Sequence, residues 1–177
     1  MKSRLLILAA CILCASSAFA QLTPPIPQTE VYIGGAYNRL CFSNCGSSPR
    51  NFFGWQTEFD YNLSKHAGVV LDLGGQYQKT PGITYANYQY MIGPQLKQRS
   101  GDWTVFVHGL AGGNAYHYPG ATRAGFAIGI GGGLDRNIGR IAAVRLLQVD
   151  SLHNHYGGVW NHNLRVSAGI VFKFGRP

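Results

Sequence analysis

The stretch Phe52-Phe-Gly-Trp-Gln-Thr-Glu-Phe-Asp-Tyr-Asn-Leu63 alternates large apolar side chains with small or polar ones. Its aromatic residues fall mostly on the odd-numbered positions, whereas Gln56, Glu58 and Asp60 occupy even-numbered positions. Successive side chains of a β-strand point to opposite faces. The stretch therefore predicts a strand with one aromatic face and one polar face, a pattern typical of a strand that separates lipid from a barrel interior.

Seven further segments of about ten residues show a comparable alternation, and they are separated by stretches rich in Gly, Pro, Asn and His. Together they predict an all-β fold, an eight-stranded antiparallel up-and-down transmembrane β-barrel that occupies residues 30–177. The predicted strands are 30–38, 52–63, 68–78, 85–96, 103–115, 123–134, 140–150 and 163–174.

The sequence pattern does not fully define the orientation or register of three predicted strands. Segment 103–115 carries apolar residues on both faces, so its orientation is undetermined. Pro94 has no backbone N–H to donate to a neighbouring strand, so we interpret it as a bulge or as the end of its strand. Arg145 has the opposite parity from Gln148 and Asp150, which predicts a bulge between them.

The connections between these segments alternate in length, as in an outer-membrane barrel with long external loops and short periplasmic turns. This alternation predicts that both chain ends of the barrel lie on the periplasmic side. The connections predicted to be external are 39–51, 79–84, 116–122 and 151–162. Those predicted to be periplasmic are 64–67, 97–102 and 136–139.

Residues 1–20 have a basic start, an apolar run and a small-residue end at Ala18-Phe19-Ala20, the layout of a secretory signal peptide. Its apolar run is shorter than the roughly 20 residues that a transmembrane helix needs. Residues 21–29 then form a Pro-rich periplasmic lead. A lipoprotein-type cleavage before Cys11 is an alternative, which the short apolar run before it disfavours.

The chain has 15 basic and 7 acidic residues, and the basic ones are scattered singly. Scattered charge and an export signal argue against nucleic acid as a partner. No later segment is apolar for long enough to form a transmembrane helix, so a closed barrel is the remaining way to span a membrane. A soluble lipocalin-like barrel is the alternative, but it needs a charged exterior that so few charged residues hardly provide.

The even-numbered face that holds Glu58, Asp60 and Asp72 corresponds to the face of the last strand that holds Arg165 and Lys173. We assign this face to the lumen because the opposite face is apolar. The predicted lumen charge network comprises Glu58, Asp60, Asp72, Arg145, Arg165 and Lys173. It could form a gated polar channel or a charged binding site, but a structural network that fills a narrow barrel is favoured, since buried charges must be paired.

Cys41 and Cys45 stand four residues apart in a loop-like stretch, which in an oxidising compartment predicts a small disulfide. A metal site beginning at this pair would need a second ligand pair, which does not follow. His153, His155 and His162 could together bind a divalent metal, but no carboxylate or thiol completes the set. We therefore predict no metal and no cofactor.

The final stretch Asn163-Leu-Arg-Val-Ser-Ala-Gly-Ile-Val-Phe-Lys-Phe174 resembles the closing strand of OmpA-like outer-membrane β-barrels. The resemblance extends to Tyr61-Asn62-Leu63, Phe106-Val107-His108-Gly109 and Gly131-Gly132-Gly133. It implies a monomeric barrel in the bacterial outer membrane, surrounded by membrane lipids and lipopolysaccharide. It also implies that the barrel-assembly machinery reads Phe172 and Phe174, although Gly175-Arg176-Pro177 follows them here.

The resemblance implies a structural role in the envelope, and two alternatives stay open. Some similar barrels are enzymes that modify lipid A, for which Ser151 is a candidate nucleophile, His153 or His155 its base and Asp150 the orienting group. We expect no enzyme, because one mobile loop would have to hold all of these. The other alternative is a surface adhesin or receptor with exposed aromatic contacts at Phe42, Tyr116, Tyr118, Tyr156 and Trp160.

Overall fold

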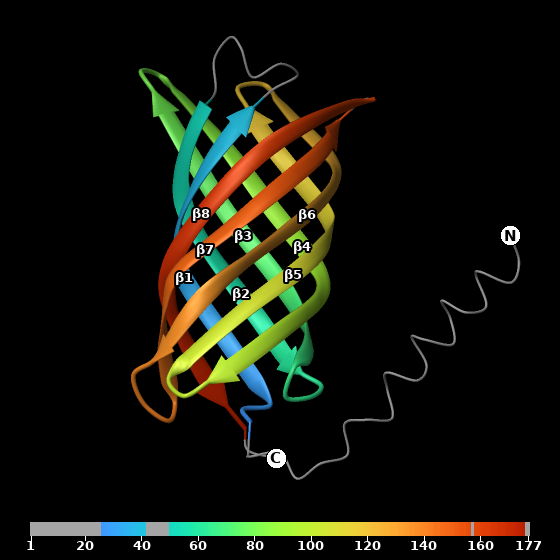
Figure 1. Ribbon diagram of the computed structural model, residues 1–177. Coiled ribbons are helices and arrows are strands. Elements are labelled where there is room, and N and C mark those ends of the chain that lie inside the picture. The colour runs from blue at the N-terminus through green and yellow to red at the C-terminus, as the bar shows by residue number, and fades with distance from the viewer. Residues whose placement is uncertain (1–25, 42–49, 157, 176–177) are drawn as a thin grey trace, which may run out of the picture.

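The computed structural model describes residues 26–41, 50–156 and 158–175, which form a closed barrel of eight antiparallel strands (Figure 1). Each strand pairs with its neighbours in the sequence, and β1 pairs with β8 to close the barrel. The predicted fold class is thus confirmed. Within these residues no helix is long and apolar enough to cross a membrane. The strands are β1 (Thr29–Cys41), β2 (Arg50–Asn62), β3 (Ala67–Thr80), β4 (Ile83–Ser100), β5 (Trp103–Tyr118), β6 (Ala121–Asn137), β7 (Ala142–Tyr156) and β8 (Val159–Phe174).

The strands run further than the sequence pattern predicts, and this shortens the connections. Two residues each join β3 to β4 and β5 to β6, with Gly82 and Gly120 at positive φ angles of 77° and 82°. Glycine adopts such angles without strain. The predicted long connections 79–84, 116–122 and 151–162 are therefore wrong, because backbone pairing continues after the apolar alternation fades.

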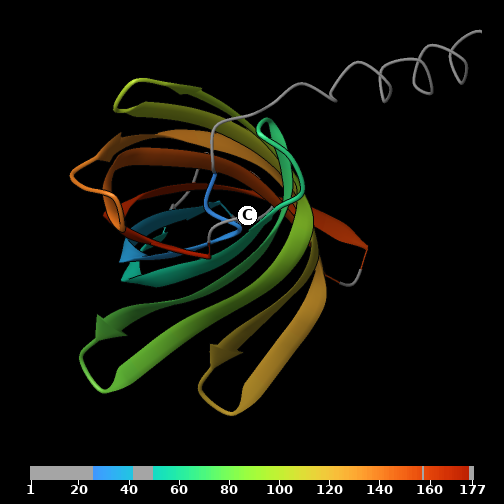
Figure 2. The same ribbon diagram turned by 90° about the horizontal axis from the view of Figure 1, so that it is seen from below.

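Both described ends of the chain lie at the same end of the barrel, which is the lower end in Figure 1 and the end that faces the viewer in Figure 2. The backbone N–H of Gln28 donates to the carbonyl of Gly175 at 3.4 Å, and that of Asn62 donates to the carbonyl of Gln28 at 2.9 Å. The turns 63–66, 101–102 and 138–141 lie at this end too. The hairpin tips 81–82 and 119–120 lie at the opposite, upper end.

The predicted bulge in β7 is present. Opposite β6, Leu147 pairs with Leu134 but Arg145 pairs with Asp135, so Leu146 is the extra residue. Opposite β8, the register shifts between Arg145 and Gln148. The bulge turns Leu146 and Leu147 outward together and leaves the side chains on either side of them in the interior.

Pro94 causes neither a bulge nor the end of its strand, so that interpretation is wrong. It pairs with Val69 of β3, and β4 continues to Ser100. On the β5 side, the ladder has the same register before and after the proline, from Ile92 to Gln95. The missing N–H thus interrupts the ladder locally without displacing it.

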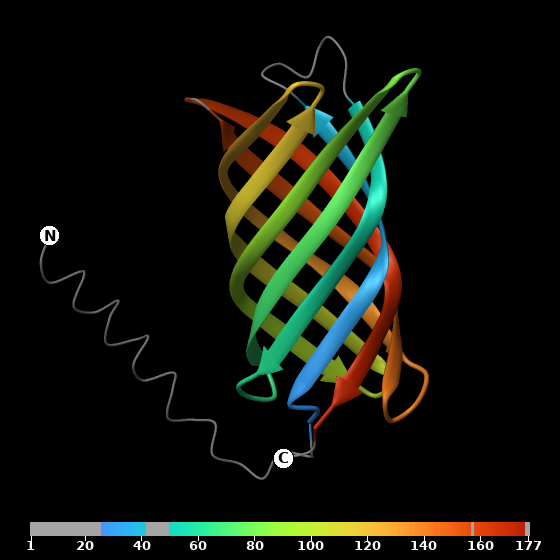
Figure 3. The same ribbon diagram turned by 180° about the vertical axis from the view of Figure 1, so that it is seen from behind.

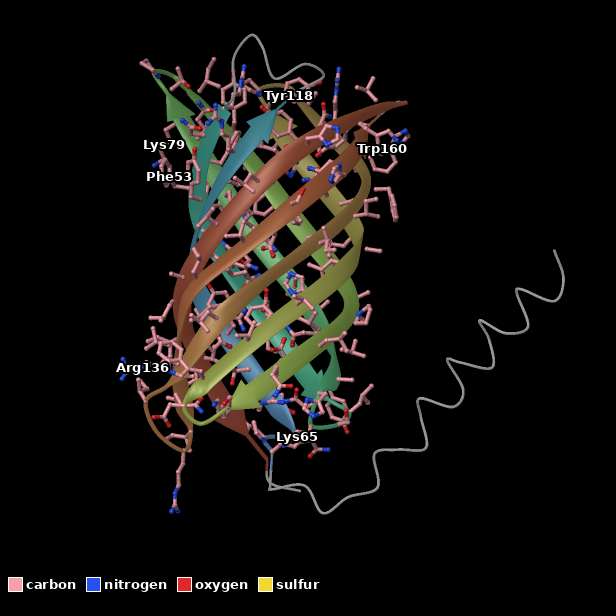
Figure 4. The ribbon with its side chains drawn as sticks, viewed as in Figure 1. Phe53, Lys65, Lys79, Tyr118, Arg136 and Trp160 are labelled. Atoms are coloured by element: carbon pink, nitrogen blue, oxygen red, sulfur yellow. The ribbon has the colours of Figure 1, made fainter. Side chains whose placement is uncertain are left out.

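The barrel is apolar outside and polar inside, the reverse of a soluble protein. Large apolar side chains such as Ile33, Trp55, Tyr90 and Ile130 are exposed on the outside of the barrel. The exposed apolar residues come from strands around the whole wall, both in front (Figure 1) and behind (Figure 3). Figure 4 shows side chains pointing outward from the wall. Of the seven acidic residues in the sequence, all but the exposed Asp102 are buried in the interior. Those six are Glu30, Glu58, Asp60, Asp72, Asp135 and Asp150.

Candidate functional site

The interior side chains form successive layers along the barrel, and the middle layer carries most of the charge. This central network joins residues of β2, β3, β5, β6, β7 and β8. Its members are Glu58, Asp72, Asp135, Asp150, Arg145, Arg165 and His108, with Gln56 and Gln148 between them. Each is almost completely buried.

Arg145 is held by carboxylates from two other strands. Its Nη1 lies 2.5 Å from Glu58 Oε2 and its Nε lies 2.8 Å from Asp135 Oδ1. The guanidinium is also stacked between two rings, with its carbon 4.3 Å from the ring centre of Tyr32 and 4.2 Å from that of Phe106. The β7 bulge brings Arg145 into the interior, so this site depends on an irregularity of the strand.

Arg165 makes a two-pronged contact with Asp72, with Nη1 2.8 Å from Oδ1 and Nη2 2.7 Å from Oδ2. Its Nε donates to Asp150 Oδ2 at 2.9 Å. Asp150 is the cross-strand partner of Arg165 on the neighbouring strand β7, whereas Asp72 is on β3, so the contact with Asp72 reaches across the lumen. Such bidentate pairs fix geometry as well as charge.

Two glutamines connect the two arginine centres, and a histidine contacts an acid of the Arg165 centre. Gln148 Nε2 donates to Glu58 Oε1 at 2.6 Å and to Asp150 Oδ2 at 3.1 Å. Gln56 Nε2 donates to Asp72 Oδ2 at 2.5 Å. His108 Nε2 lies 2.8 Å from Asp150 Oδ1. Because neighbouring acids share these partners, the network behaves as one unit.

Glycine on β6 makes space for this network. A side-chain carbon added at Gly131 would collide with Asp150 Oδ1, and one added at Gly133 would lie 2.7 Å from the Phe106 ring. Both glycines face inward beside the network. The glycine-rich segment is therefore a packing requirement of the charged layer.

A second charged layer lies nearer the lower end. Lys97 Nζ forms ion pairs with Glu30 and, at 2.7 Å, with Asp60 Oδ2. Arg99 Nη2 lies 3.1 Å from Glu30 Oε1. Lys173 is half-buried at this end, where its Nζ donates to the side-chain oxygen of Asn137.

Five of the six predicted network residues thus lie in the interior with ionic partners, and Lys173 lies apart from the central network. Lys97 and Arg99 were not predicted as interior charges, because the alternation was taken to end at Leu96. Their parity with Gln89 and Gln95 was the available signal. Glu30 and Asp135, which follow the inward parity of β1 and β6, were not predicted either.

The predicted catalytic set is not assembled. Ser151 and His153 are on the outward side of β7, and Ser151 Oγ lies 3.3 Å from His153 Nε2. Asp150 points inward to Arg165, so the strand itself separates it from the other two. His153 also faces His162 across the strand pair, with ring centres 4.5 Å apart. In the part of the chain that the structure describes, no group of three or more His, Cys, Asp or Glu side chains is placed to hold a metal.

The aromatic residues predicted as surface contacts separate into two environments. Tyr116 is buried, and Tyr118 and Tyr156 are half-buried against it at the upper end of the interior. Trp160 points outward near the upper end (Figure 4). Phe42 lies outside the described residues.

Several other predictions fall on parts of the chain that the structure leaves undescribed. They are the signal peptide 1–20, the lipoprotein alternative at Cys11, most of the 21–29 lead and the Cys41–Cys45 disulfide, of which Cys45 and the Cys41 side chain lie outside the described part. Phe172 and Phe174 are described, and both are exposed on the outside of β8 at its lower end.

The fold is similar to several solved structures. Neisserial surface protein A matches with a TM-score of 0.67 and 13% identity, over 83% of this chain and 97% of that one. Ail, the attachment invasion locus protein of Yersinia pestis, matches with a TM-score of 0.57 and 18% identity, over 83% of this chain and 99% of that one. The outer membrane protein OprG from Pseudomonas aeruginosa matches with a TM-score of 0.55 and 9% identity, over 84% and 97%.

No family model matches the sequence, and no curated protein matches it. At these low identities the similarity to solved structures concerns the fold alone.

Proposed function

We propose that this chain is an integral β-barrel protein of the bacterial outer membrane, with a structural role in the envelope and a lumen closed by side chains. The observation that carries the proposal is the reversed distribution of charge, with six of the seven acids inside and large apolar side chains outside. Apolar outward faces suit lipid. A soluble lipocalin-like barrel needs the opposite arrangement, so we set that alternative aside.

The central network supports a closed lumen. Arg145 and Arg165 are fully buried, and each is paired with carboxylates from other strands. Eight strands leave an interior just wide enough for side chains to fill. A hydrated ion could pass only by separating these pairs, and a buried charge without its partner is strongly unfavourable.

The membrane part of the proposal is tested by gel mobility of the folded protein before and after boiling, together with far-UV circular dichroism in detergent. We expect a boiling-dependent mobility shift and a β-sheet spectrum. A water-soluble protein without the shift would contradict membrane insertion.

The closed lumen is tested separately by current recordings in planar bilayers. We expect no sustained current through the native protein. Steady ion-selective steps would contradict the closed lumen while leaving the membrane barrel intact.

We also propose which molecules contact the barrel and how it is oriented in the membrane. The apolar outer surface would contact membrane lipids and lipopolysaccharide, and the barrel would act as a monomer without enzymatic activity. The exposed Phe172 and Phe174 would serve the barrel-assembly machinery during insertion. Placing the chain termini on the periplasmic side makes the upper end of Figure 1 the external end.

A further inference from the structure

The upper end of the barrel interior is lined by tyrosine and arginine. We define the upper mouth as Arg50, Tyr85, Tyr118, Arg123 and Tyr156, which come from β2, β4, β5, β6 and β7. Arg123 is exposed and the other four are half-buried, so a ligand can reach them from the upper end. Figure 4 shows Tyr118 at this end.

The floor of the mouth is a buried apolar layer. Leu40, Phe52 and Tyr116 are buried and pack together, and Tyr85, Tyr118 and Tyr156 pack against them. A ligand would therefore rest on this floor and remain above the central network.

Arg50 is held in place by aromatic groups. Its guanidinium carbon lies 4.4 Å from the ring centre of Tyr85, and its Nη1 lies 3.4 Å from the Tyr116 hydroxyl oxygen. Arg123 lies 5.8 Å from the ring centre of Tyr118. Stacking of this kind orients an arginine while its remaining N–H groups stay free to donate.

The two arginines of the mouth have no acidic partner. All seven acids of the sequence are within the described residues, and none of them forms an ion pair with Arg50 or Arg123. By contrast, Arg145 and Arg165 in the central network are each paired with carboxylates. The charge of the mouth is therefore available to a ligand.

The whole upper end is positively charged in the described part of the chain. Arg39 and Lys79 are exposed on the outside of the barrel there, in addition to the two arginines of the mouth. The one acid outside the interior, Asp102, lies in a turn at the lower end. A surface with one sign of charge concentrates ligands of the opposite sign.

We propose that the upper mouth binds a carboxylate-bearing saccharide from the external medium. A guanidinium matches a carboxylate in shape and charge. The tyrosine hydroxyls can bond to the hydroxyl groups of a sugar, and the half-buried rings can contact its C–H groups. The inference rests on the proposed function, which makes this end external. It favours a soluble saccharide over a lipid headgroup, because the tyrosines of the mouth pack on the interior side of the barrel wall, whereas the large apolar side chains that would face lipid are on its outside.

The test is calorimetric titration of the full-length protein, folded in detergent, with a tetrasaccharide that contains glucuronate. The matched ligand has glucose in place of glucuronate, and a tetraglutamate peptide provides charge without sugar. We expect binding of the glucuronate tetrasaccharide at least about tenfold tighter than that of either control ligand, the size of one charged hydrogen bond.

Two variants distinguish a specific binding site from general electrostatic attraction at the upper end. Arg50→Gln should weaken binding of the glucuronate tetrasaccharide by about tenfold or more. Lys79→Gln removes a charge of the same sign from the same end but outside the mouth, and it should change affinity by less than about twofold. Boiling-dependent gel mobility verifies that each variant is folded.

Three results would overturn the inference. They are no binding by the folded barrel, equal losses in Arg50→Gln and Lys79→Gln, and equal affinity for the tetraglutamate peptide. None of them affects the proposed function, because membrane insertion is read independently from the gel mobility.

Discussion

Replacing Arg165 with methionine tests whether the central network holds the barrel together. The side chain is fully buried, and its loss leaves Asp72 and Asp150 without their guanidinium partner. Removing one member of a buried ion pair costs about 3–5 kcal/mol. Gln56 still donates to Asp72, and His108 still contacts Asp150, so we expect a loss within this range rather than twice as much.

The free energy of unfolding is measured by urea titration in phospholipid vesicles, followed by tryptophan fluorescence. We expect Arg165→Met to lower it by about 3–5 kcal/mol. Lys79→Met is the matched control, because it removes an exposed charge that forms no ion pair in the described structure, and it should stay within about 0.5 kcal/mol of the parent.

A double-mutant cycle then examines the pairing itself. Asp72→Asn lies opposite Arg165 and removes the carboxylate of the two-pronged contact. If the two residues stabilise the barrel through each other, the double variant loses less than the sum of the single losses, by about 1–3 kcal/mol. Strict additivity, or a loss below about 1 kcal/mol in Arg165→Met, would refute the reasoning.

Three further predictions concern the packing, the closure and the assembly of the barrel. Gly131→Ala should lower the urea midpoint, since the new methyl group would collide with a carboxylate of the network, whereas Gly35→Ala meets nothing within 4 Å and should leave the midpoint unchanged. Glu58→Gln removes the carboxylate that Arg145 contacts, so brief current steps in planar bilayers should become more frequent than in the parent. An unchanged record would argue against the network as the closure. Phe174→Ala should slow insertion by purified assembly machinery, measured as the appearance of the folded gel band, while Phe53→Ala, which changes another exposed phenylalanine at the other end, should not; equal rates would count against an assembly signal.

The outward and inward faces of the clear strands could be predicted from the sequence, because apolar and polar residues alternate along them. Alternation is a local property with a period of two residues, so each strand alone shows which face is apolar. Glu58, Asp60 and Asp72 could therefore be assigned to the interior without knowledge of their partners. The Arg145 bulge was predictable for the same reason, because charge on the wrong face of a strand calls for a shift of register.

Two cases show that local sequence is not sufficient to predict the position and partners of a side chain. Pro94 was interpreted as a bulge or a strand end, and residues 97–102 were assigned to a turn, although Lys97 and Arg99 are part of the lower charged layer. Likewise Ser151 and Asp150 are adjacent in the sequence and were considered as one site, but extended strand places them on opposite faces of the barrel wall.

The sequence by itself therefore determined the number of strands, their order and the side of the wall on which each clear strand places its charges. Only the tertiary structure determined which charged residues form ion pairs with one another. Arg165 reaches Asp72, which is 93 residues away in the chain, because barrel closure and strand tilt bring β3 opposite β8. It also decided that Arg50 and Arg123 end up beside tyrosines at a common mouth with no acid within reach. Contacts across a lumen depend on the registers of all the intervening strands added together, and no local pattern encodes that sum.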